Sequence, residues 1–130
     1  AKVINSYIKK NNLLSIDDIG FKKQYEIFNM IKKDKIKYLV VNADTILQDP
    51  LKTLKKLCKI LKIRFTKKML SWPKGKRSSD GIWSTVWYKN VELSNTFSKY
   101  KKEKYYVPKK YNDIYEESLK YYNEMNQYSI

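Results

Sequence analysis

"KYLVVNADTILQDPLKTLKKLCKIL", residues 37–61, joins a short apolar run to an amphipathic segment. The apolar run is continuous and rich in β-branched residues, which is typical of a strand buried on both faces of a parallel sheet. Asp49 and Pro50 then supply an N-cap and a proline at the first helical position. Leucines follow on one face and lysines on the other. The stretch therefore predicts a strand over 37–42 and a helix over 50–62.

The flanking sequence predicts more helix than strand. Ser15 and Asp18 have the spacing of a capping box, and aromatic and aliphatic residues then recur every three or four positions. Pro108 precedes a second such stripe, rich in tyrosine. These patterns predict helices over 16–33 and 109–126. Between them lies a long irregular loop over 64–100, with short helical possibilities at Thr66–Leu70 and Val86–Leu93.

These elements give an α/β fold class, mostly helical, with one central strand. A lone strand cannot satisfy its own backbone hydrogen-bonding groups. The chain also begins with Ala1 rather than methionine. We therefore expect residues 1–130 to be a segment of a longer protein.

The chain is strongly basic, with 28 Lys and Arg against 13 Asp and Glu in 130 residues, a formal charge of +15. Two interpretations stay open. The lysines form a solvated surface shaped by an AT-rich coding sequence, or they form a patch for a polyanion such as nucleic acid, an acidic membrane or a phosphate-bearing small molecule. Only Arg64 and Arg77 are arginines, whereas dedicated phosphate clamps favour arginine.

The residue types present exclude several kinds of chemistry within this segment. Cys58 is the single cysteine and there is no histidine, so an intrachain disulfide, a cysteine-based zinc site and an imidazole base are excluded. We expect no metal. No apolar run reaches the length of a bilayer span and no signal peptide is visible, so we expect a cytoplasmic protein.

"WPKGKRSSDGIW", residues 72–83, concentrates cations, glycines and tryptophans in one loop. Glycine allows backbone N–H groups to approach phosphate oxygens, cations neutralise a phosphate, and a tryptophan offers a flat face for a purine. The candidate nucleotide-binding residues are Lys74, Gly75, Lys76, Arg77, Gly81 and Trp83.

The order of motifs resembles the C-terminal half of P-loop sulfotransferases. The residues that carry this resemblance are "YLVVNADTILQDPLKTLKKLCKILKIRF" and the series Trp72-Pro73-Lys74-Gly75, Asp80-Gly81-Ile82-Trp83, Trp87-Tyr88 and Ser94-Asn95-Thr96-Phe97. The loop also resembles the R-K-G-x-x-G-x-W loop of many sulfotransferases. Five residues separate the two glycines here instead of two, and Pro73 replaces the arginine.

The resemblance implies a P-loop-type parallel-sheet fold and a parent enzyme that transfers a sulfuryl group from PAPS to a hydroxyl or amine. The loop would contact the 3′-phosphate of the donor, and Trp87, Tyr88 and Ser94 are the candidates for the acceptor side. The acceptor is a small molecule or a glycan. The family's phosphate-binding P-loop and catalytic base lie in its N-terminal half, so we expect no catalytic residue in this segment.

Simpler interpretations compete for the same residues. The tryptophans fill a small hydrophobic core under the loop, the three cations form a solvated turn, and Asp80 shapes the turn before Gly81. Asp44 caps the turn after the strand, and Ser94 and Thr96 cap a short helix. The rival function is a basic module for nucleic acid or an anionic surface, although no motif for specific nucleic-acid recognition is present.

Overall fold

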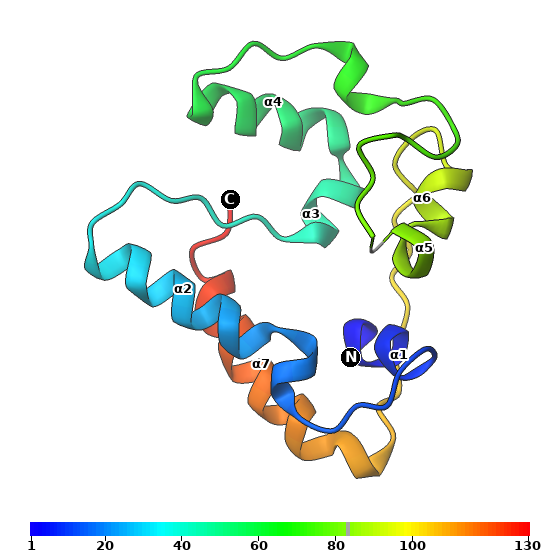
Figure 1. Cartoon of the computed structure of the whole chain (residues 1–130). Helices are drawn as coiled ribbons and strands as arrows, with labels where there is room; N and C mark the ends of the chain where they lie inside the picture. The colour runs from blue at the N-terminus through cyan, green and yellow to red at the C-terminus, as the bar shows by residue number, and fades with distance from the viewer. Residues whose placement is uncertain (83) are drawn as a thin grey trace. The chain divides into compact units, whose positions relative to one another are not determined.

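The computed structural model describes residues 1–82 and 84–130, and for Trp87 the backbone only. The described residues divide into two compact units: unit 1 is Ala1–Asn42 with Lys102–Ile130, and unit 2 is Ala43–Lys101. The fold is mostly helical (Figure 1), with the order α1 (Lys2–Ile8), η1 (Ile16–Ile19), α2 (Phe21–Lys33), α3 (Ala43–Gln48), α4 (Pro50–Leu61), η2 (Lys67–Leu70), α5 (Ser84–Trp87), α6 (Lys89–Leu93), η3 (Lys109–Tyr111) and α7 (Asn112–Asn126).

Unit 1 is built on the packing of α2 against α7, which lie side by side (Figure 1). Tyr25 lies 5.0 Å from Tyr121 between ring centroids, and the buried Phe28 lies 5.2 Å from Tyr128. Tyr121 lies in α7 and Tyr128 just after it, so the two contacts advance in the same order along both segments, and α2 and α7 run in the same direction (Figure 1). Aromatic pairs of this kind add about 0.5–1.5 kcal/mol each to the area they bury.

The predicted helix over 16–33 is divided into two elements. Ser15 and Asp18 do form a capping box, but the helix that they begin is the 3₁₀ turn η1. Gly20 then takes a left-handed conformation, φ +72°, and α2 begins at Phe21. The prediction missed this break because the apolar spacing continues across the glycine.

The strand predicted over 37–42 is reduced to an isolated bridge. Among the described residues no strand forms, and Val40 makes a single parallel bridge to Ser129. The amide of Ile130 also donates to the Val40 carbonyl at 3.2 Å. The Asn42 side chain donates to the Asn126 side chain at 2.9 Å, which fixes the end of this stretch to α7. A β-branched run forms a strand only where a ladder of backbone partners exists, and the segment after α7 offers a short one.

Unit 2 is organised by α4, whose beginning follows the sequence prediction. The Asp49 side chain accepts from the Lys52 amide at 2.9 Å, and Pro50 is the first helical residue. The helix ends at Leu61, with Lys62 left-handed at φ +57°. Thr53 is buried, and its hydroxyl donates to the Thr45 carbonyl of α3 at 3.1 Å. This bond joins α3 to α4.

Short helices form in the long loop close to the two places where the sequence suggested them. The loop over 64–100 includes η2, α5 and α6, and the final predicted helix begins with the 3₁₀ turn η3 before α7. Cys58 is buried, with its Sγ 3.7 Å from the Met69 sulfur of η2. Within the described part of the chain, no helix combines the length and the apolar character needed to cross a bilayer.

Candidate functional site

The loop after η2 is closed at its base by backbone and side-chain contacts. Ser71 and Thr96 form an antiparallel bridge, and the Trp72 amide donates to the Asn95 carbonyl at 2.9 Å. The Trp72 ring meets the Phe97 ring edge-on at 5.3 Å. The first part of the loop is therefore joined to the segment that follows α6, and Trp72 serves as hydrophobic filling, one of the simpler interpretations of its sequence position.

Ser94 strengthens the same closure. Its hydroxyl accepts a hydrogen bond from the Trp72 indole nitrogen at 3.1 Å and donates one to the Val91 carbonyl at 2.8 Å. Ser94 is also the C-terminal capping residue of α6. A serine hydroxyl has a single proton to donate. That proton is already engaged, so Ser94 positions the loop more readily than it contacts an acceptor.

Gly75 is needed for the path of the backbone. Its φ is +106°, a conformation that residues with a Cβ rarely adopt, while no atom lies within 4 Å of the place where a Cβ would stand. Its amide donates to the Glu92 carbonyl of α6 at 2.8 Å. The sequence suggested that this N–H could bind a phosphate. In the structure the N–H is already bonded to the Glu92 carbonyl and is not available to a phosphate.

Arg77 and Asp80 form the turn at the tip of the loop. The Arg77 amide donates to the Asp80 carboxylate at 3.0 Å, and the Asp80 amide donates back to the Arg77 carbonyl at 3.0 Å. The Arg77 guanidinium also donates to the Pro73 carbonyl at 3.4 Å. The prediction that Asp80 shapes this turn is confirmed. The bond to the Pro73 carbonyl holds the Arg77 guanidinium near Pro73, the residue before Lys74.

The loop presents its positive charge to solvent. Lys74, Lys76 and Arg77 are exposed, and none of them forms an ion pair with a described residue. Unit 2 holds 14 Lys and Arg against 4 Asp and Glu, a net charge of +10, whereas unit 1 holds 14 against 9, a net charge of +5. In unit 2, Asp49 and Asp80 accept from backbone amides. The three cations of the loop are therefore exposed, with no ion pair to a described residue.

The remaining predicted residues are spread over the rest of the loop. Gly81 is exposed, and its carbonyl accepts from the Ser84 amide at 2.9 Å. Tyr88 stands at the start of α6 and is 38% exposed. Trp83 lies outside the described residues, and Trp87 belongs to α5 with its side chain outside the description. The structure brings Gly75 against α6 and Ser94 against Trp72.

A hollow of about 470 Å³ lies beside the base of this loop. Leu47 and Pro50 contribute its apolar wall, Phe97 and Tyr100 contribute aromatic rings, and Lys99 contributes a cation. Phe97 belongs both to this hollow and to the Trp72 contact. Of its residues, only Phe97 belongs to a motif that the sequence analysis singled out, S-N-T-F. The residues from α3 and α4 are brought to the hollow by the fold and could not be predicted from the sequence.

No metal centre is visible in the described part of the chain, where no three His, Cys, Asp or Glu residues gather as a ligand set. The chemistry that the described residues of unit 2 offer is the binding of an anion by lysine and arginine next to an aromatic and apolar surface.

The family of the chain follows from comparison with known proteins. Residues 1–129 match the Sulfotransferase domain family. The chain belongs to this family, as its motifs predicted. No solved structure matches the chain.

Two curated relatives from Arabidopsis thaliana are similar in sequence. "Branched-chain-amino-acid aminotransferase-like protein 1" is 42% identical over 84 residues, which is 65% of this chain and 15% of the relative. "Branched-chain-amino-acid aminotransferase-like protein 2" is 30% identical over 109 residues, 84% of this chain and 20% of the relative. The chain thus spans at most about a fifth of the length of these relatives.

Proposed function

We propose that this chain is the C-terminal part of a sulfotransferase that moves a sulfuryl group from PAPS to a hydroxyl or amine, and that residues 73–81 cover the donor. The observation that carries the proposal is the group of three exposed cations on one anchored loop, in a member of the sulfotransferase family. PAPS, when bound, supplies the sulfuryl group. The role of this chain is to hold and orient an anion.

The residues of the loop fit a phosphate through their side chains. Lys74 and Lys76 each carry an ammonium head with no described acidic partner, and Arg77 has guanidinium donors beyond the one on Pro73. Charge-assisted hydrogen bonds are about twice as strong as neutral ones. The aromatic hollow at Phe97 and Tyr100 supplies a surface on which a purine would stack. Gly75 and Asp80 contribute by shaping the loop.

A parallel sheet in the whole protein is the second part of the proposal. In unit 1, α2 leads to Val40 and α7 leads to Ser129, and these two residues form a parallel bridge. Two parallel helices, each followed by an extended segment, are arranged like neighbouring units of an α/β sheet. We infer that 37–42 becomes a strand where further parallel partners are present.

On the acceptor side, Tyr88 is the stronger of the described candidates, because it is 38% exposed, whereas the Ser94 hydroxyl already donates to the Val91 carbonyl. The names of the two relatives refer to aminotransferase-like proteins. Since the match covers 15% and 20% of their lengths, those names carry no assignment for this stretch.

One observation favours the competing function, a basic module for nucleic acid or an anionic surface. The charge of +10 on unit 2 is not confined to the loop, because α4 also presents exposed lysines. Binding through such a surface depends on the number of charges and falls steeply with salt. Binding through a shaped loop depends on which charges are removed.

The experiment compares two variants that lose the same charge. In the loop variant, Lys74, Lys76 and Arg77 become alanine; in the helix variant, Lys52, Lys56 and Lys59 of α4 become alanine. Each variant is titrated with adenosine 3′,5′-bisphosphate by calorimetry at two salt concentrations. We expect the loop variant to bind at least about tenfold more weakly than the helix variant, from the loss of charge-assisted hydrogen bonds. Equal weakening in both variants would instead support the basic module.

A further inference from the structure

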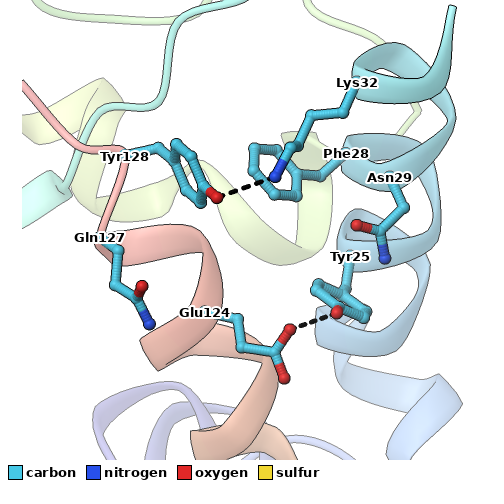
Figure 2. A pocket seen from close by; sticks show the side chains of 7 residues that line it. All are labelled: Tyr25, Phe28, Asn29, Lys32, Glu124, Gln127 and Tyr128. Carbon is cyan, nitrogen blue, oxygen red and sulfur yellow. Dashed lines mark hydrogen bonds between the residues drawn. The ribbon is translucent and has the colours of Figure 1, made fainter.

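A second hollow lies in unit 1, between α2 and the end of α7 (Figure 2). It has a volume of about 120 Å³, and most of the residues that line it are exposed. Phe28 and Tyr128 contribute aromatic rings, and Asn29 and Gln127 contribute amides. Two opposite charges also line it, Lys32 from α2 and Glu124 from α7. The hollow belongs to neither the loop nor the proposed donor site.

The cation of this hollow is held by aromatic groups. The Lys32 ammonium donates to the Tyr128 hydroxyl at 2.8 Å and stands 4.3 Å from the centre of the Tyr128 ring and 5.3 Å from that of Phe28. The hydrogen bond to Tyr128 raises the pKa of Lys32 above its ordinary value, so the head group stays charged. No described carboxylate pairs with it, which leaves two ammonium protons for a ligand.

The anion of the hollow is the Glu124 carboxylate, and it too is hydrogen-bonded to a tyrosine hydroxyl. The Tyr25 hydroxyl donates to one oxygen of the Glu124 carboxylate, as the dashed line in Figure 2 shows. A carboxylate has a second oxygen and further lone pairs to offer. Lys32 and Glu124 therefore face the same small space, each oriented by a tyrosine hydroxyl, and they do not form an ion pair with each other.

Opposite charges that share a pocket without pairing leave room for a ligand between them. Lys32 and Glu124 are both exposed, so a ligand with one charge gains a charge-assisted hydrogen bond from one wall only. A ligand with both charges satisfies both walls, and the Asn29 and Gln127 amides can bond to either of its ends. We propose that this hollow binds a small zwitterion, such as a free amino acid, with its carboxylate on Lys32 and its ammonium on Glu124.

The first test separates the two charges of the ligand. The chain is titrated with L-alanine, with propionate, which lacks the ammonium, and with ethylamine, which lacks the carboxylate, and the amide shifts of α2 and α7 are followed by NMR. We expect saturable binding of alanine in the millimolar range, the affinity of a ligand with few contacts. Each control should bind about tenfold more weakly, because it forfeits one charge-assisted interaction.

The second test uses variants that keep the size of the side chains. Glu124→Gln and Lys32→Met should each weaken alanine binding about tenfold, and Lys32→Arg should restore part of it. Where Lys32→Met disturbs folding, Tyr128→Phe keeps the ring and removes only the hydroxyl that orients the ammonium, and it should weaken binding by a few fold. Equal binding of propionate and alanine would overturn the proposal. So would the absence of a saturable shift with alanine at a concentration of about 100 mM.

Discussion

The two units use their charged residues in different ways. In unit 1, the described ion pairs Lys22–Asp17 and Lys23–Glu26 are formed, and Lys32 stands on aromatic rings. In unit 2, Asp49 and Asp80 accept from backbone amides, and the cations of the loop have no described acidic partner. The contacts described in unit 1 are thus dominated by aromatic packing between two helices, whereas unit 2 holds its shape by caps and turns and leaves the cations of its loop exposed.

The sequence provides separate probes for this comparison. All three tryptophans lie in unit 2, and ten of the twelve tyrosines lie in unit 1. Tryptophan fluorescence therefore reports on unit 2, and the near-ultraviolet circular dichroism of tyrosine reports mainly on unit 1. Urea unfolding followed by both probes shows which unit a substitution affects.

The largest effect is expected from Phe28→Ala in unit 1. Phe28 is 7% exposed and contacts the rings of Tyr25, Tyr38 and Tyr128. Removing a buried phenylalanine ring costs about 3–5 kcal/mol. The tyrosine-monitored transition should move to much lower urea. Ile27→Ala, at a neighbouring position that is 43% exposed, is the control and should cost far less. Equal losses in the two variants would refute the packing of α2 on α7.

A smaller effect is expected from Gly75→Ala in unit 2. The methyl group meets no atom within 4 Å, so the cost comes only from the φ of +106°, about 1–3 kcal/mol. Gly81 has equally open surroundings and is not among the glycines with positive φ, so Gly81→Ala is a matched control that should change little. The tryptophan-monitored transition measures both. A loss in the control as large as in Gly75→Ala would refute the loop geometry.

The cap of α4 gives the next effect. Asp49→Ala removes the acceptor of the Lys52 amide and should lower the stability of unit 2 by about 1 kcal/mol. Asp49→Asn keeps an oxygen in the same place and should retain most of that stability. The difference between the two variants isolates the cap. If both lose stability equally, the negative charge and not the hydrogen bond is responsible.

The smallest effect concerns the response of unit 1 to acid. Hydrogen bonds from the backbone amides of Ser15 and Leu14 lower the pKa of Asp18 below its ordinary value of 3.8. The carboxylate therefore contributes stability above that value, and the contribution is lost as the pH falls through the lowered pKa. Asp18→Asn should lose less stability than the parent between pH 6 and pH 2. Asp17→Asn, whose described partner is Lys22 at 4.0 Å, should behave more like the parent.

The sequence was a good guide where a local rule decides the structure. The α4 helix follows from Asp49, Pro50 and the leucine stripe, and the turn at Asp80 follows from its place before Gly81. The stretch 37–42 shows the limit, because a strand depends on partners that local residues do not supply. The family itself was predicted from the order of the loop motifs.

The hollow of unit 1 was beyond sequence reasoning for a related reason. Lys32 and Glu124 are 92 positions apart, and only the parallel packing of α2 and α7 brings them to one space. The aromatic stripes indicated that both helices have an apolar face. Nothing in the two stripes specified the register between them, and the register decides which charged residues meet.

The central claim is that the loop of unit 2, rather than its general charge, binds the donor. The most direct measurement is an NMR titration of the chain with adenosine 3′,5′-bisphosphate, with amide shifts assigned along unit 2. We predict saturable shifts centred on residues 73–81 and on the hollow at Phe97 and Tyr100, with little change along α4. Shifts spread evenly over the lysines of α4 and the loop, and abolished by moderate salt, would contradict the account.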